Sequence, residues 1–267
     1  RFERDITQED KENFDKIEGL KIKNYLSLRM PDGDESRRND KTGIMYTHQF
    51  FTFRNILIID RIYEKVKDNI ILLAWLTSGI QNISKMWKFK PDRKGGTLAG
   101  TLYIPSLNLE QNPFEVLKRK ISSFVKTDYP TRGNSICSVN SATNLSLIEN
   151  NSIDYIFTDP PFGANLMYSE LSFIWESIIK VRTNNKCEAI TNKFQNKTNI
   201  EYKSLMLLSL IEFYRILKPG KWMTVEFSNT SAAVWNGIQT AITSAGFVIA
   251  NVAALDKKQG SFKAVNT

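Results

Sequence analysis

The side chains best suited to chemistry stand in one short segment, Asp159-Pro160-Pro161-Phe162. Two consecutive prolines fix the backbone φ angle and remove two N–H donors, so neither a helix nor a strand ladder continues through them. The segment therefore holds a carboxylate, a backbone carbonyl and an aromatic ring in a stiff loop. This set suits one task, which is to accept hydrogen bonds from the amino group of a planar base while the ring stacks on its face.

The pattern around this segment predicts how it is positioned. An apolar run before it indicates a buried strand over residues 153–158. The loop then begins at the carboxyl end of a strand, which is the edge where open α/β sheets bind ligands. From residue 134 onward, strand and helix patterns alternate as in a parallel α/β sheet. We expect strands at 135–139, 153–158, 222–227, 247–253 and 262–265, and helices at 169–181, 202–217 and 230–244.

These residues resemble a known family. Thr158-Asp-Pro-Pro-Phe-Gly163, followed by Ala164-Asn-Leu-Met-Tyr-Ser-Glu170, is similar to the catalytic motif of the amino-group DNA methyltransferases, which reads Asp/Asn/Ser-Pro-Pro-Tyr/Phe/Trp. The Asp form is commoner in adenine-N6 enzymes and the Ser form in cytosine-N4 enzymes. The resemblance extends over roughly half of the chain, from Gly133 to Thr267. It implies an α/β fold, a partial Rossmann-like methyltransferase sheet with a mainly helical N-terminal segment.

The resemblance also implies a function. The chain would be an S-adenosylmethionine-dependent DNA methyltransferase that acts on the exocyclic amine of a flipped base, with adenine N6 preferred. Asp159 and the Pro160 carbonyl would orient the amine, while Pro161 stiffens the turn. Phe162 would stack on the base after it leaves the helix. Transfer would be direct, without a covalent enzyme intermediate.

Further site residues follow from the same resemblance. The segment Ser138-Val-Asn-Ser-Ala-Thr-Asn-Leu145 resembles the family segment, often Gly-Asp/Ser-Ala, that touches the adenine of the cofactor. The implied cofactor-binding residues are Asn140, Ser141, Ala142, Thr158 and Asp159. The implied substrate-binding residues are Phe162, Gly163, Asn165 and Tyr168. The alternative interpretation of the Asp-Pro-Pro-Phe motif is an ordinary strand-ending Asp-Pro turn. For the other residues it is ordinary turn and helix-cap chemistry.

One part of the family pattern is missing. The cofactor motif Phe-x-Gly-x-Gly, and the acid that binds the ribose, occur nowhere in the 267 residues. The glycines at 95, 96 and 100 do not form a dinucleotide fingerprint, because no strand precedes them and no helix follows. Because the chain also begins with Arg1, we expect a C-terminal portion of a larger enzyme whose upstream part carries the cofactor motif. Alone, it should bind S-adenosylmethionine poorly or not at all.

The remaining sequence indicates organisation and partners. Residues 1–110 are predicted to be a mainly helical inserted or accessory segment, with helices near 54–67 and 70–86, and residues 111–267 the catalytic part. A net charge of +8 favours a polyanionic partner. The resemblance implies that this partner is DNA, with RNA less expected. Two basic clusters could grip phosphates, or could be solvated faces. Their members are Lys85, Trp87, Lys88, Lys90, Arg93 and Lys94, and then Lys118, Arg119 and Lys120.

Other classes are disfavoured. Two cysteines and one histidine provide neither a disulfide framework nor a zinc site, so no metal is expected. No signal peptide or membrane span is readable, and a cytoplasmic, nucleoid-associated protein is expected. Two rival functions stay open: an RNA base methyltransferase of the guanine-N2 type, and a non-catalytic DNA-binding subunit of a methyltransferase complex. The recognition sequence, and a role in restriction-modification, defence or housekeeping, are not readable.

Overall fold

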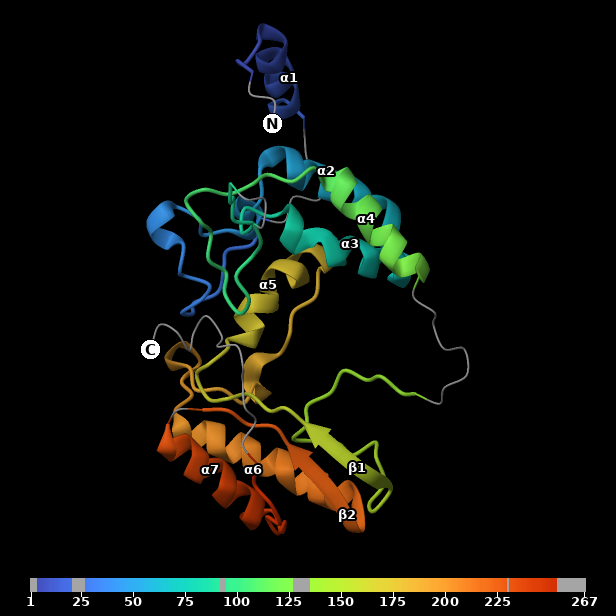
Figure 1. Cartoon of the computed structure of the whole chain (residues 1–267), viewed down its shortest axis with the longest axis vertical. Coiled ribbons are helices and arrows are strands. Elements are labelled where there is room, and N and C mark those ends of the chain that lie inside the picture. The colour runs from blue at the N-terminus through green and yellow to red at the C-terminus, as the bar shows by residue number, and fades with distance from the viewer. Residues whose placement is uncertain (1–3, 21–26, 92–94, 127–134, 230, 254–267) are drawn as a thin grey trace. The chain divides into compact units, whose positions relative to one another are not determined.

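The computed structural model describes residues 4–20, 27–91, 95–126, 135–229 and 231–253. Within these ranges the chain forms seven α-helices and one two-stranded parallel sheet, so the α/β class is confirmed at this level (Figure 1). The chain divides into two compact units, residues 1–138 with 164–198, and residues 139–163 with 199–267. Neither unit coincides with the expected segments 1–110 and 111–267.

The first unit is helical. It contains α1 (Gln8–Glu18), α2 (Phe53–Val66), α3 (Ile70–Ile83), α4 (Pro113–Lys126) and α5 (Tyr168–Ile179). The helices expected at 54–67 and 169–181 are confirmed within two residues, and the helix expected at 70–86 ends three residues early. Apolar side chains at helical spacing form the core, in which Leu76, Ile80 and Ile174 are fully buried.

Small residues and specific hydrogen bonds set the packing of α3 on α4. A Cβ at Gly79 would lie 2.8 Å from Leu117 Cδ2, so a larger residue there would require the end of the Leu117 side chain to shift. The indole of Trp75 donates a hydrogen bond of 3.0 Å to the Leu117 carbonyl. The two helices therefore pack closely enough for side chain and backbone to bond across them.

The start of α5 is tied to two loops through Glu170, which is 2% exposed. Its carboxylate accepts hydrogen bonds from the backbone N–H groups of Glu35 and Ser36, each at 2.9 Å, and from Asn192 Nδ2 at 3.0 Å. A buried carboxylate needs such donors because it has left water. Glu170 therefore organises the loops around residues 33–36 and 192.

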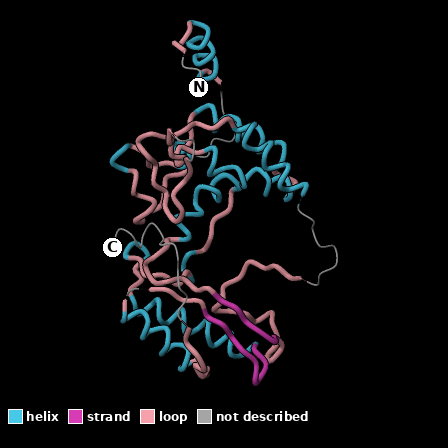
Figure 2. The backbone as a smooth tube through the Cα atoms, in the orientation of Figure 1, coloured by secondary structure: helices cyan, strands magenta, loops and turns pink. Residues whose placement is uncertain are grey.

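The second unit carries the sheet. β1 (Ile153–Thr158) pairs in parallel with β2 (Leu217–Val225), and the two strands appear in magenta in Figure 2. α6 (Asn199–Ile216) runs directly into β2, and α7 (Ala232–Ser244) packs along α6. The strand at 153–158 is confirmed. The strand expected at 222–227 is confirmed in its centre, but it begins at 217 and ends at 225.

Two other expected strands are wrong. Residues 135–139 form no strand, and Ile136 is 97% exposed. Residues 247–253 form none either, and Val248 is 90% exposed. A strand requires a hydrogen-bonded neighbour, and neither segment pairs with β1 or β2. The segment 262–265 lies outside the described residues.

One face of the sheet carries aromatic side chains that are more than half exposed, those of Tyr155, Phe157 and Trp222. Tyr155 and Trp222 are register partners on neighbouring strands, and the Tyr155 hydroxyl donates to Thr224 Oγ1 at 2.6 Å.

In the described ranges, no helix is long and apolar enough to cross a bilayer.

Candidate functional site

The loop after β1 carries two hydrogen-bond acceptors that no described residue engages. Asp159 is exposed, and neither its carboxylate nor the Pro160 carbonyl bonds to any residue that the structure describes. The preceding residue is held, because the Thr158 carbonyl accepts the N–H of Glu226 at 2.9 Å. The Asp159 carboxylate is thus exposed at the carboxyl end of a strand, and the adjoining Pro160, which is buried, carries a second acceptor that no described residue engages.

The next two carbonyls are held by side chains. The Tyr202 hydroxyl, on α6, donates a hydrogen bond of 2.7 Å to the Pro161 carbonyl. The Asn229 side-chain amide donates one of 2.9 Å to the Phe162 carbonyl. Tyr202 is 1% exposed, so its hydroxyl is supplied by the core of the second unit. The loop is therefore fixed at its third and fourth residues.

An aromatic series continues from the loop. The rings of Phe162 and Phe227 meet at 5.1 Å and 80°, and those of Phe227 and Trp235 at 5.2 Å and 87°. Edge-to-face pairs of this kind add to the burial energy of the rings. Phe162 nevertheless remains half-buried, so part of its ring is accessible for stacking.

Gly163 ends the loop in the left-handed region, with φ +69°. A Cβ there would only touch Asn229 Nδ2 at 3.6 Å and Val234 at 3.9 Å. The backbone angle, and not lack of space, is what favours glycine at this position.

The residues expected to hold the cofactor form a turn of their own. Asn140 accepts from the Ser141 N–H at 2.9 Å and donates to the Asn144 carbonyl at 2.9 Å. Ser141 Oγ lies 2.8 Å from Thr143 Oγ1. Asn140 and Ala142 are exposed, and no described contact links residues 140–142 to residues 158–163. Among the described residues, the hydrogen bonds of Asn140 and Ser141 therefore stay within their own turn, and the assignment of residues 140–142 to the cofactor stays a prediction.

The segment leading into β1 is fastened to the end of α6. Leu145 donates its N–H to Glu212 Oε2 at 2.6 Å, and its carbonyl accepts from Arg215 Nη2 at 2.8 Å. Arg215 also bonds to the Ile148 carbonyl at 2.9 Å and to Glu212. The hydrogen bond from the Arg215 guanidinium, followed by that from the Leu145 N–H, lowers the pKa of Glu212 to about 2.

Two expected substrate-binding residues fall in the first unit. Asn165 and Tyr168 are both exposed, at the turn into α5. The structure therefore groups Asp159 through Gly163 in the second unit and places Asn165 and Tyr168 in the other.

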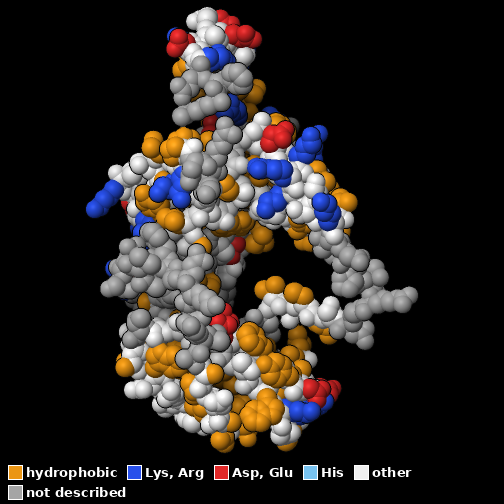
Figure 3. Space-filling model, viewed as in Figure 1, with side chains coloured by type: hydrophobic (Ala, Val, Ile, Leu, Met, Phe, Trp, Pro, Cys, Tyr) orange, Lys and Arg blue, Asp and Glu red, His pale blue; other side chains and the backbone are white. Residues whose placement is uncertain are grey.

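The basic clusters also belong to the first unit. Lys88 and Lys90 are exposed, while Lys85 is half-buried and burial lowers the pKa of its ammonium group. Arg93 and Lys94 lie outside the described residues. On α4, Lys118 and Arg119 are exposed, and Arg119 bonds to Gln111 at 3.0 Å. Figure 3 shows more basic side chains over the first unit than over the second on this face.

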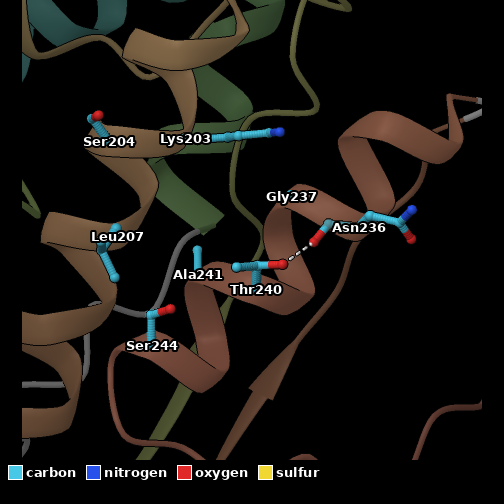
Figure 4. Close-up of a pocket in the computed structure, with 8 residues that line it drawn as sticks. All are labelled: Lys203, Ser204, Leu207, Asn236, Gly237, Thr240, Ala241 and Ser244. Carbon is cyan, nitrogen blue, oxygen red and sulfur yellow. Dashed lines mark hydrogen bonds between the residues drawn. The ribbon is translucent and has the colours of Figure 1, made fainter.

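A shallow pocket of about 260 Å³ lies between α6 and α7 (Figure 4). Lys203 crosses it over Gly237, where a Cβ would come within 2.5 Å of Lys203 Cε. None of residues 158–163 lines this pocket, so it does not belong to the loop site.

Three residues of the site were not found from the sequence, namely Tyr202, Phe227 and Asn229. A signal existed for two of them, because Phe227 and Asn229 directly follow β2, whose carboxyl end lies at the same edge as that of β1. Tyr202 carried no signal beyond its place in an apolar helix. In the part of the chain that the structure covers, no group of three or more His, Cys, Asp or Glu side chains is arranged to hold a metal.

Comparison of the chain with protein-family models, with curated proteins and with solved structures found no match.

Proposed function

We propose that this chain is the catalytic-loop part of an S-adenosylmethionine-dependent DNA methyltransferase that modifies the exocyclic amine of a flipped base, with adenine N6 the preferred target. One observation carries the proposal. The loop at the carboxyl end of β1 leaves the Asp159 carboxylate and the Pro160 carbonyl without partners among the described residues, while the next two carbonyls are bonded to Tyr202 and Asn229. Acceptors that no described residue engages, in a loop whose next two carbonyls are held, suit a bound donor.

The chemistry asked of these residues is specific. An exocyclic amine is a poor nucleophile because its lone pair is delocalised into the ring. Two acceptors on its two N–H bonds favour tetrahedral nitrogen and free the lone pair for attack. Asp159 and Pro160 supply two such acceptors, and Phe162 supplies the stacking surface for the flipped base.

The secondary structure supports a partial Rossmann-like sheet. β1 and β2 are parallel, and α6 leads directly into β2. Two parallel strands joined through a helix are the smallest unit of such a sheet. The loop that carries Asp159 lies at the carboxyl ends of these strands, which is where ligands bind in open α/β sheets.

The proposal places S-adenosylmethionine binding outside this chain. The Phe-x-Gly-x-Gly motif is missing from the sequence, and residues 140–142 bond within their own turn. We therefore propose that an upstream part of the same protein binds the methyl donor, and that this chain contributes base recognition and activation.

The test is methyl acceptance by the intact protein. Tritiated S-adenosylmethionine would be supplied with unmethylated DNA and, separately, with RNA, and the modified nucleoside would be identified by mass spectrometry. The proposal predicts N6-methyladenine in DNA. Methylguanosine in RNA would instead establish the RNA-enzyme alternative, and absence of any methylated nucleoside would contradict both.

A second candidate is a non-catalytic DNA-binding subunit. It is favoured by the one observation that, among the described residues, the hydrogen bonds of Asn140 and Ser141 are made within their own turn. It predicts DNA binding that is unchanged in Asp159→Ala and no methylation in the intact protein. Loss of methylation in Asp159→Ala, from an active wild type, excludes it.

A further inference from the structure

Asn229 is bonded at three points around the loop. Its side-chain amide donates to the Phe162 carbonyl at 2.9 Å, and its side-chain oxygen accepts the Ser231 N–H at 2.7 Å. Its own carbonyl accepts the indole N–H of Trp235 at 2.7 Å. Both polar ends of one side chain are thus engaged, one on the loop after β1 and the other at the start of α7.

The aromatic series passes through the same residues. Trp235, which holds the Asn229 backbone, also contacts Phe227, and Phe227 contacts Phe162. Asn229 therefore holds the backbone of Phe162 while Phe227 and Trp235 support its ring. These contacts form a closed circuit that begins and ends at Phe162.

We infer that Asn229 is a positioning residue, which fixes the Phe162 backbone so that its ring stacks on the flipped base while Asp159 and the Pro160 carbonyl meet the amine. The inference rests on the proposed function, since it concerns the same site. Asn229 does not touch the base. It acts through Phe162, and a displacement of about 1 Å at a reacting group can cost on the order of a hundredfold in rate.

The chain allows a matched test. Asn229→Asp keeps the size of the side chain and the acceptor for the Ser231 N–H, but removes the donor to Phe162. Asn236→Asp introduces the same charge on the exposed surface of α7, where the Asn236 side chain has no partner among the described residues. If Asn229→Asp does not fold, Asn229→Ser takes its place, because a serine hydroxyl can also accept the N–H of Ser231 two residues on but is too short to reach the Phe162 carbonyl.

Methylation would be measured in the intact protein, well below the melting temperature of each variant. For Asn229→Asp we expect kcat to fall by roughly tenfold to a hundredfold with KM for DNA nearly unchanged, and Asn236→Asp to match the wild type. A kcat equal to that of Asn236→Asp, with only a lower melting temperature, would show a purely structural role and overturn the inference. A wild-type protein that methylates nothing would instead contradict the proposed function itself.

Discussion

The hydroxyl of Tyr202 donates a hydrogen bond of 2.7 Å to the carbonyl of Pro161, and it does so from a side chain that is 1% exposed. A proline carbonyl in a surface loop is ordinarily satisfied by water. Here a buried phenol takes that place, so the loop after β1 is connected directly to the packing of α6. The conformation of the loop then depends on the folding of this helix.

Removing this bond should weaken the second unit. Tyr202→Phe leaves the ring in place but deletes the donor, and we expect unfolding to become easier by about 1 kcal/mol. Tyr214→Phe is the control, because the exposed Tyr214 hydroxyl has no partner among the described residues. Urea unfolding monitored by circular dichroism measures both. Equal midpoints for the two variants would mean that the bond to Pro161 contributes nothing.

Methylation should depend on the stacking surface of the Phe162 ring. Phe162→Ala removes the stacking surface, whereas Phe162→Tyr keeps it. Because base–aromatic stacking is worth about 1–3 kcal/mol, we expect the alanine variant to lose roughly 5- to 150-fold in kcat/KM and the tyrosine variant to lose little. Phe157→Ala, on the exposed face of β1, is the control. A comparable loss in that control would point to damage to the sheet in place of lost stacking.

Gly33 should tolerate no side chain. A Cβ at this position would come within 2.1 Å of the Glu170 carboxylate carbon, and that buried carboxylate cannot move without leaving its donors. We expect Gly33→Ala to destabilise the first unit by about 1–3 kcal/mol. Gly96→Ala is the matched substitution, since nothing lies within 4 Å of its added carbon. Thermal unfolding measures the melting temperatures of both variants. Equal melting temperatures would contradict the clash with the Glu170 carboxylate.

The ion pair of Glu212 with Arg215 should make the stability of the protein fall at low pH. The pKa of Glu212 is lowered from 4.5 to about 2 in the folded protein. Because the folded pKa lies below the unfolded one, the stabilisation is complete above about pH 4.5 and is lost as the pH falls toward about 2. Urea midpoints measured across this window should fall less steeply in Glu212→Gln than in the wild type. Glu149→Gln, in the same fastened segment, should keep the wild-type slope, and parallel slopes in all three proteins would contradict this assignment.

The sequence predicted the elements whose patterns are local. Helices α2, α5 and α6 follow from apolar spacing, and β1 from a short apolar run ended by two prolines. Residues 135–139 have a similar apolar character, but Ile136 is almost fully exposed because no neighbouring strand is there to pair with it. A short apolar run indicates that a segment favours an extended backbone. A strand also needs a hydrogen-bonded neighbour, and the run itself does not indicate one.

The candidate site divides in the same way. Asp159 to Phe162 were identified because prolines constrain the backbone by covalent structure alone. Asn229 and Tyr202 act through hydrogen bonds to residues 67 and 41 positions away. Such long-range bonds depend on the fold, so the place of Asn229 after a strand indicated its position but not its partner, and Tyr202 carried no signal.

The most direct measurement is the single-turnover rate of DNA methylation by the intact protein and by Asp159→Ala. Asp154→Ala is the control, since Asp154 is an exposed carboxylate on the same strand that pairs with Lys218 and Lys221. We expect Asp159→Ala to lose on the order of a hundredfold or more in rate, while the control stays near the wild type. Equal rates in wild type and Asp159→Ala would contradict the assignment of the Asp-Pro-Pro-Phe loop as the site of chemistry.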